Sequence, residues 1–306
     1  ICAAMRAVGK TTITMITHVT ANIVNVILNY CLIGGHFGFP ALGVRGAAIA
    51  TVSGTAVSCV IAFVFALKKG GYLRLKFSFP PRFDRVTISG LVRVGGGSIA
   101  ESVCLRLGFL MINKMVANIG TAAFAAYQIV SQVTSLSFTL GDGISTAGAT
   151  MVGQSLGAKR RDVAQANVSI ARRLSVIASI LLMAVTLIFR KKIGTLFTKE
   201  ADVLEGVALA FIPVIVSIIP QNARVVYSGC LRGAGDVKYV AMVSLISVAI
   251  VRPLCTYILC YPLRAVLPML QLAVTGPWIA FVIDSFMRDL MYKKRIKDGE
   301  WLNIRL

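Results

Sequence analysis

Acidic residues and histidines are scarce in this sequence. Its 306 residues include only 12 Asp and Glu and 2 His. Two histidines make no convincing metal site, the 7 cysteines form no CxxC pair, and no Walker loop, nucleophile elbow or HExxH motif occurs. The sequence therefore gives no basis for ATP-driven or metal-dependent chemistry. We expect a protein that is not an enzyme and that uses no cofactor.

Charge of any kind is rare, whereas apolar residues are abundant. Hydrophobic residues make up 57% of the chain, charged residues make up 14%, and the mean hydropathy is +0.79. A soluble core could not absorb so much apolar surface, so we expect an all-α, polytopic membrane helical bundle. Long apolar runs predict eight membrane spans. They cover residues 12–34, 46–67, 89–112, 122–150, 168–189, 203–231, 237–261 and 272–292.

The net charge of +20 could indicate nucleic-acid binding, but its distribution argues otherwise. A nucleic-acid domain gathers its basic residues on a soluble face, whereas here they lie between apolar spans. Most fall on one side of the proposed topology, in stretches such as 68–85, 159–161 and 293–297. Because cytoplasmic loops retain Lys and Arg, we expect a bacterial inner (cytoplasmic) membrane protein with both chain ends in the cytoplasm. The expected partner is the lipid bilayer, not nucleic acid.

Two stretches of the chain repeat one another. MRAVGK at 5–10 is followed by VRGAAIA at 44–50, and LRGAGD at 231–236 is followed by VTGPWIA at 274–280. A duplicated unit in a membrane protein predicts two bundles of the same topology, which many transporters use for alternating access. The second copy has far more sequence before it than the first, and the chain starts at Ile1. We therefore interpret the chain as a fragment that lacks much of its first lobe.

The polar segment 68–85 predicts the boundary between the two lobes, because paired glycines and paired prolines break helices there. The predicted parts are the last two helices of a truncated N-terminal lobe (1–67), a cytoplasmic linker (68–88), a C-terminal six-helix lobe (89–292) and a cytoplasmic tail (293–306).

Polar residues recur at helical spacing inside three of the apolar spans. Steps of three and four residues place each set on one helix face. The sets are Thr11, Thr14, His18, Asn22, Asn25 and Asn29; Gln128, Gln132, Ser135, Thr139 and Asp142; and Ser217, Gln221, Arg224 and Ser228. Polar faces toward lipid are costly, so these faces should meet protein or a water-filled cavity. Two interpretations stay open: a substrate cavity, or hydrogen bonds that hold helices together. A shorter set, Thr51, Thr55 and Ser58, suits the second interpretation better.

Glu101 is the most unusual single residue, because it lies within the apolar run 89–112. A carboxylate at membrane depth either pairs with a cation or takes up a proton. Glu101 is therefore a candidate for ion coupling, and the alternative is a structural ion pair with Arg93, with Arg106 or with an arginine on another helix. Asp142 is the second candidate carboxylate.

Two other arginines in apolar runs, Arg224 and Arg252, are buried cations that need acceptors. Glu101 or Asp142 could serve. Asp284 and Arg288 lie four residues apart in the last span, and this spacing predicts that they pair with each other.

Taken together, these motifs resemble the multidrug and toxic compound extrusion (MATE) family of secondary transporters. The resemblance spans nearly the whole chain and rests on the two arginine-glycine turns, NIVNVILNYCLIGG at 22–35, Glu101, AAYQIVSQ at 125–132 and GATMVGQSLGAK at 148–159. It implies a twelve-helix protein of two six-helix lobes, of which this chain covers the last two helices of the first and all six of the second. It also implies cation-coupled export of organic, often cationic, compounds.

The resemblance further implies roles for single residues. Glu101 matches the second-lobe glutamate that one branch of the family uses in cation binding, which would place a sodium ion near it. Gln221 falls where that branch often carries an acidic residue. An amide can coordinate or hydrogen-bond but cannot titrate, so the coupling ion, H⁺ or Na⁺, stays open.

We therefore predict a monomeric, cation-coupled (H⁺ or Na⁺) antiporter that exports small organic compounds, expected to be cationic, by alternating access. The predicted ion-coupling residues are Glu101, Asp142 and Gln221, and no other metal is expected. The predicted substrate cavity is lined by Asn25, Asn29, Gln128, Gln132, Thr139, Arg224, Tyr227 and Ser228. One alternative is a flippase for lipid-linked precursors from the related superfamily, which a strongly cationic cavity open to lipid would favour. The other is a membrane-embedded binding or receptor module that does not transport.

Overall fold

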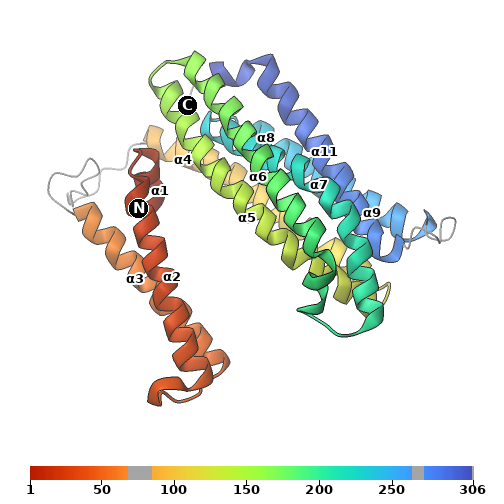
Figure 1. Cartoon of the computed structure of the whole chain (residues 1–306). Coiled ribbons are helices and arrows are strands. Elements are labelled where there is room, and N and C mark those ends of the chain that lie inside the picture. The colour runs from red at the N-terminus through yellow and green to blue at the C-terminus, as the bar shows by residue number, and fades with distance from the viewer. Residues whose placement is uncertain (68–84, 264–271, 305–306) are drawn as a thin grey trace. The chain divides into compact units, whose positions relative to one another are not determined.

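A computed structural model describes residues 1–67, 85–263 and 272–304 of the chain (Figure 1). These residues form helices and short turns and contain no strand, so the predicted all-α fold is confirmed. The chain divides into two compact units, Ile1–Arg82 and Phe83–Leu306, each described here by itself. Residues 68–84 of the predicted linker lie outside the described residues.

The described helices follow the predicted spans closely. Unit 1 contains α1 (Cys2–Ala7), α2 (Thr11–Gly34), the short η1 (His36–Gly38) and α3 (Val44–Leu67). Unit 2 contains α4 (Arg85–Ala117), α5 (Thr121–Gly157), α6 (Arg161–Thr195), α7 (Ala201–Gly233), α8 (Val237–Ser244), the π-helix η2 (Leu245–Val251), α9 (Arg252–Cys260), α11 (Leu272–Asp298) and η4 (Glu300–Asn303). Several helices continue past the predicted ends, because a polar sequence can extend a helix beyond its apolar run.

Within the described parts of the chain, five helical stretches are long and apolar enough to cross a membrane. They are α2, α3, residues 161–189 of α6, α7, and Val237–Cys260. The 37-residue α5 has the length as well, but its polar stripe lowers its apolar content. The protein is a multi-pass membrane protein.

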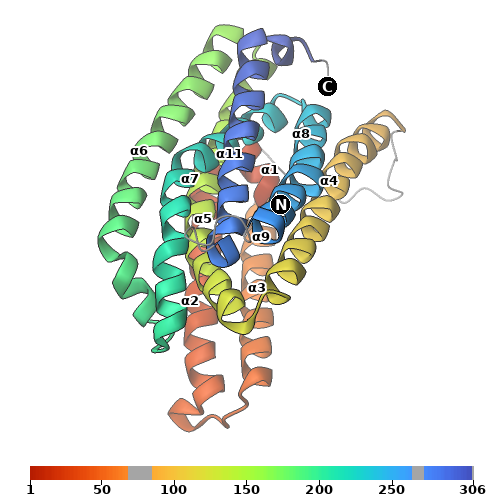
Figure 2. The same ribbon diagram turned by 90° about the vertical axis from the view of Figure 1, so that its right-hand side faces the viewer.

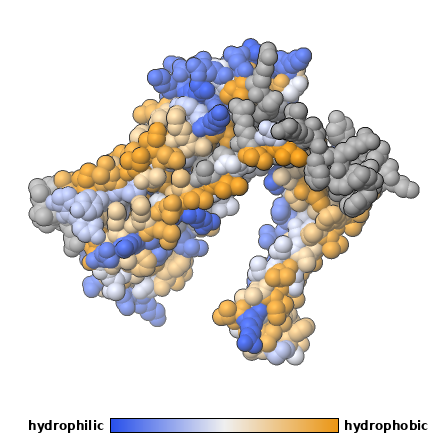
Figure 3. Space-filling model, turned by 180° about the vertical axis from the view of Figure 1, so that it is seen from behind, coloured by the Kyte–Doolittle hydropathy of each residue, from blue (hydrophilic) through white to orange (hydrophobic). Residues whose placement is uncertain are grey.

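The outer surface of unit 2 is apolar where the helices face outward. On α6, Ile170, Leu174, Ile177 and Leu181 follow steps of four, three and four residues, and each is at least half exposed. Figure 3 shows such hydrophobic patches along the sides of the helices. In water this surface would be costly, whereas lipid tails match it.

Helix α7 forms the centre of unit 2. It packs against α5, α6 and α11, as the two ribbon views show (Figures 1 and 2). Every residue from Pro220 to Leu231 is buried, including the polar side chains of Gln221, Asn222 and Arg224. Gly229 and Gly233 allow close contact with α5, because a Cβ at either position would collide with Ser145 or Ala149. Helix α7 is therefore packed closely against its neighbours over this stretch.

Two apolar clusters stabilise this bundle. One joins Tyr127 on α5, Phe211 on α7 and Trp278 on α11. The other surrounds Tyr292 and includes Trp301, whose indole nitrogen donates to the carbonyl of Ile296 at 3.1 Å. The predicted tail, 293–306, therefore continues α11 to Asp298 and then returns a buried tryptophan to the core.

The sequence repeat is also present in the backbone. Gly9 and Gly235 follow the two arginine-glycine turns and have φ angles of 82° and 87°, a left-handed conformation that favours glycine. In both turns the glycine N–H donates to the carbonyl of the repeat arginine, Arg6 or Arg232, at 2.9 and 3.0 Å. Each copy therefore ends its helix with the same turn.

Candidate functional site

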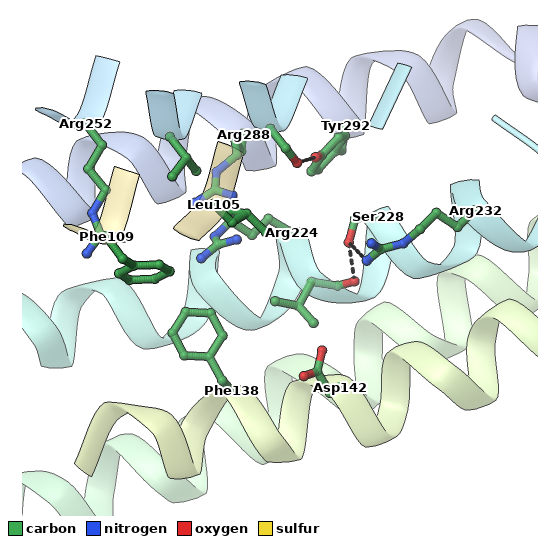
Figure 4. A pocket seen from close by; sticks show the side chains of 13 residues that line it. Leu105, Phe109, Phe138, Asp142, Arg224, Ser228, Arg232, Arg252, Arg288 and Tyr292 are labelled. Carbon is green, nitrogen blue, oxygen red and sulfur yellow. Dashed lines mark hydrogen bonds between the residues drawn. The ribbon is translucent and has the colours of Figure 1, made fainter. Parts of the chain in front are cut away.

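Unit 2 encloses a pocket of about 390 Å³. Helices α4, α5, α7 and α11 and the stretch from α8 to α9 contribute to its wall (Figure 4). Its lining residues are Leu105, Phe109, Phe138, Asp142, Arg224, Val225, Ser228, Arg232, Ser244, Val248, Arg252, Arg288 and Tyr292. The charged members are four arginines and one aspartate.

Helical periodicity explains how single helices supply several lining residues. On α7, Arg224, Ser228 and Arg232 follow one another at steps of four, so they share one face. The guanidinium of Arg232 donates to the hydroxyl of Ser228 at 3.1 Å, and that hydroxyl donates to the carbonyl of Val225 at 2.8 Å. The same spacing joins Leu105 to Phe109 on α4.

A π-helix precedes Arg252. Pro253 has no N–H to donate to the preceding turn, and the seven residues of η2 widen the helix just before it. Arg252 is the first residue of α9. It therefore lies where the π-helix ends and the regular α-helical spacing of side chains resumes. Figure 4 shows Arg252, Arg224 and Arg288 on the wall of the same pocket.

Three of the arginines are almost completely buried. Arg224, Arg252 and Arg288 are 7%, 3% and 4% exposed. Arg288 pairs with the buried Asp284, as the sequence spacing predicted, and the hydroxyl of Ser247 donates to the same carboxylate. Asp284 is therefore already occupied by two donors.

Aromatic rings hold the other two guanidinium groups. The Arg224 guanidinium lies 5.4 Å from the ring centre of Phe138 and 5.9 Å from that of Phe281. The Arg252 guanidinium lies 4.7 Å from Phe281 and 5.1 Å from Phe109. These cation–π contacts orient the cations but supply no hydrogen-bond acceptor in the ring plane.

The hydrogen-bonding capacity of the arginines is not used up by the described residues. The Nε atoms of Arg224, Arg252 and Arg288 are buried and have no hydrogen-bond partner in the described part of the chain. No carboxylate there pairs with Arg224 or Arg252, so Asp142 does not serve as the acceptor that the sequence suggested. The pocket wall therefore presents guanidinium N–H groups that can still donate hydrogen bonds to a ligand.

The structure places the other residues of the α7 stripe away from the pocket wall. Gln221 is fully buried, and its amide has no polar partner among the described residues. Ser217 donates to the carbonyl of Val214 at 2.7 Å. Tyr227 is buried in the apolar core, where the guanidinium of Arg172 lies 5.6 Å from its ring centre.

Asp142 is the member of the α5 stripe that reaches the pocket, whereas Gln128, Gln132 and Thr139 are exposed on the surface of unit 2. The described hydrogen bond of Thr139 is local, from its hydroxyl to the carbonyl of Ser135 at 3.0 Å. Contacts of α5 with other helices use its opposite face. There Ser145 donates to the carbonyl of Val225 on α7 at 2.9 Å.

Unit 1 has its own polar pocket of about 330 Å³ between α2 and α3. It combines the α2 stripe with the shorter α3 set, and is lined by His18, Ala21, Asn22, Asn25, Thr51, Gly54, Thr55 and Ser58. The amide of Asn29 donates to the side-chain oxygen of Asn25 at 3.0 Å.

Glu101 lies in α4, one helical turn before Leu105, but its side chain is outside the described residues, as is that of Arg93. No group of three or more metal-ligating side chains occurs among the residues that were described.

Cysteine accessibility distinguishes the two stripes of unit 2. In a variant without the 7 native cysteines, we expect Gln128→Cys, Gln132→Cys and Thr139→Cys to react with a small aqueous thiol reagent. Ser217→Cys and Gln221→Cys should stay unlabelled over the same time, because both positions are fully buried. Failure of all three α5 positions to react would place that face against lipid or protein.

Sequence reasoning missed several of the pocket's residues. Arg288 was expected only as an ion-pair partner, and Phe109 and Phe138 were not considered. The available signal was an arginine inside an apolar run, which in membrane proteins marks a functional site by default.

Comparison with known proteins gives consistent results. The MatE family model matches residues 98–258. A probable multidrug resistance protein NorM from Thermotoga maritima is 27% identical over 98% of this chain and 62% of its own length. Among solved structures, a mutant of the Vibrio cholerae MATE transporter VcmN is 21% identical with a TM-score of 0.82, covering 97% of this chain and 65% of that one. The chain thus spans less than two thirds of each.

A second solved structure concerns the polarity of such pockets. It is a MOP superfamily transporter from Pyrococcus furiosus, for which reverse polarity of the binding pocket was taken to suggest a different function. It is 20% identical, with a TM-score of 0.79, and the match covers 94% of this chain and 63% of that chain. At this identity the similarity shows a shared fold.

Proposed function

This chain belongs to the multidrug and toxic compound extrusion family, MatE, and from that membership we propose that it forms part of an exporter of small organic compounds. The observation that carries the proposal is the pocket of about 390 Å³ in unit 2. Its charged wall is enclosed by helices whose outer surface is apolar. Ligand pockets commonly have volumes of about 300–1,000 Å³, so the cavity suits a small solute held at membrane depth.

We further propose that export is coupled to an ion and proceeds by alternating access. A transported ion must bind a group whose charge or ligation differs between two access states. Glu101 and Asp142 are the proposed groups, with H⁺ or Na⁺ as the coupling ion, because one precedes the pocket residue Leu105 in α4 and the other lines the pocket. Gln221 cannot titrate and is proposed only as a buried polar neighbour.

Helix irregularities next to the pocket support a wall that rearranges. Pro220 lies inside α7 about one helical turn before Arg224, and the π-helix η2 precedes Arg252. Such features loosen a helix locally and are frequent at functional sites. We propose that the protein works as a monomer in the cytoplasmic membrane, with both ends of this chain in the cytoplasm.

The described pocket does not suit the predicted cationic substrate. Four arginines against one aspartate would repel a cation at this position. The sequence-based expectation followed the family resemblance, whereas the residues of this wall favour the opposite charge. The structure from Pyrococcus furiosus, with its reverse polarity of the binding pocket, supports such variation on the same fold.

A lipid-linked precursor flippase is the second candidate. The arginine-rich wall favours it, since lipid-linked precursors carry phosphate groups. Movement of a lipid-linked phosphate between leaflets, without movement of a soluble dye, would identify this activity.

Vesicle transport tests the proposal. The natural protein that contains this chain would be reconstituted in liposomes, with an H⁺ or Na⁺ gradient imposed across the membrane. We expect gradient-dependent movement of at least one small organic dye from a panel of anions and cations, and an ionophore should abolish it. Equal dye movement with and without the gradient, at the level of protein-free liposomes, would refute the proposed export.

A further inference from the structure

We propose that the pocket of unit 2 binds a soluble organic anion. Its carboxylate, sulfonate or phosphate group would lie among Arg224, Arg252 and Arg288, and its apolar body would contact Phe109 and Phe138. This assignment names the substrate class of the proposed exporter and in that respect rests on the proposed function. The binding itself stands on the geometry of the pocket alone.

The charge of the described pocket wall is unbalanced. Among the described residues of the wall, four are arginines and Asp142 is the one carboxylate. Asp284 lies behind Arg288 and already accepts from Arg288 and Ser247. Buried cations are costly unless an anion compensates them, and the described residues leave that compensation incomplete. A bound anion would supply it.

The hydrogen-bond donors of the wall also suit an oxyanion. Arg224 and Arg252 are buried and line the pocket, and no hydrogen bond or ion pair to a described residue occupies their guanidinium groups. A guanidinium presents its N–H groups in a plane and binds the oxygens of carboxylate, sulfonate or phosphate in pairs. Lysine would offer a point charge instead. The wall therefore has the donors that an oxyanion requires.

Aromatic rings hold these guanidinium groups in position before a ligand binds. The ring of Phe281 lies 5.9 Å from the Arg224 guanidinium and 4.7 Å from that of Arg252, so one aromatic residue positions both cations. The rings of Phe138 and Phe109 lie against the same cations at 5.4 and 5.1 Å. Side chains held in this way lose little further freedom when a ligand binds.

The rest of the pocket limits the size and character of the ligand's body. Leu105, Phe109 and Phe138 supply an apolar wall next to the arginines (Figure 4), and Val248 also lines the pocket. An anion with an aromatic or aliphatic body would bury that body there. A volume of about 390 Å³ accommodates the whole of such a molecule, whereas the tails of a lipid would have to lie outside it. We therefore assign a soluble anion as the occupant, although a lipid phosphate shares the head chemistry.

Binding of two matched dyes tests the assignment. Fluorescein and rhodamine 123 share a xanthene ring system and differ in charge, the first being an anion and the second a cation. We expect the detergent-solubilised natural protein to bind fluorescein, measured by fluorescence anisotropy, and to bind rhodamine 123 at least about tenfold more weakly. Equal or tighter binding of rhodamine 123, or no binding of fluorescein, would overturn the proposal.

Substitutions of the pocket arginines test whether fluorescein binds at this site. Arg224→Gln and Arg252→Gln should each weaken fluorescein binding about tenfold or more, as for the loss of a charged hydrogen bond. Arg173→Gln removes the same charge from an exposed position on α6 and should leave binding unchanged. Melting temperatures separate loss of binding from loss of fold. Equal affinity in all three variants, each folded, would contradict the assigned site.

Two further measurements distinguish a soluble anion from a lipid headgroup, and anion binding from export. If a water-soluble short-chain phosphatidate displaces fluorescein at far lower concentration than benzenesulfonate does, the occupant is a lipid headgroup and the soluble anion is excluded. In the vesicle assay, transport of rhodamine 123 alone would refute the anion assignment and keep the proposed export. Fluorescein binding without transport of either dye would refute the export and keep the anion site.

Discussion

Replacing Asp284 by alanine is expected to lower the stability of the folded protein by about 3–5 kcal/mol, the usual cost of breaking a buried ion pair. Asp284 is fully buried and accepts from Arg288 and from the hydroxyl of Ser247. Its removal would leave Arg288, which is 4% exposed, without its carboxylate next to two further buried arginines. The melting temperature and the yield of monodisperse protein in detergent measure the effect.

Two variants control this prediction. In Asp284→Ala combined with Arg288→Met, no charge is stranded, so most of the lost stability should return. Asp162→Ala removes the aspartate of an exposed pair with Arg160, where the two side chains are 69% and 66% exposed, and should change the melting temperature little. Full stability of Asp284→Ala alone would mean that pocket water solvates Arg288 adequately.

Replacing Glu101 by glutamine is expected to remove the dependence of export on the ion gradient. The proposed role requires a group that gains or loses a cation between access states, and glutamine cannot titrate. The factor by which the ion gradient stimulates transport by the natural protein should fall roughly 5- to 150-fold. This is the size of effect that ordinary coupling free energies between two sites produce. Membrane insertion and yield should be preserved, because the substitution keeps size and polarity.

Glu200→Gln is the matched control, since Glu200 is an exposed glutamate just before α7. It should transport normally. Full gradient dependence in Glu101→Gln would mean that Asp142 or a residue outside this chain couples the ion. Asp142→Asn then tests the first of these. Loss of folded protein without a specific transport defect would instead identify Glu101 as the structural partner of an arginine.

Much of the fold could be predicted because membrane helices are encoded locally. An apolar run of sufficient length identifies α2, α3 and α7 without reference to any neighbour. The repeated arginine-glycine turn was readable for the same reason, since a left-handed residue at Gly9 and Gly235 depends on the local chain. The π-helix before Pro253 was not predicted, because its seven residues look like any apolar run.

Less of the site could be predicted, because it depends on contacts between helices far apart in the sequence. Periodicity placed Arg224 and Ser228 on one face of α7 but did not show that Arg252 and Arg288 meet that face. It also grouped Ser217 and Gln221 with them, although the pocket ends before those residues. Helical spacing gives the face of a residue, whereas the neighbouring helices decide which part of the face remains open.

An anion bound in the pocket can be located directly by crystallography. A crystal of the natural protein grown with 4-bromobenzenesulfonate would show the bromine by its anomalous scattering. We predict a bromine peak between Phe109 and Phe138, with the sulfonate near Arg224 and Arg252, and the loss of this peak in Arg252→Gln. An empty arginine pocket, with bromine bound only elsewhere on the protein, would contradict the proposed anion site.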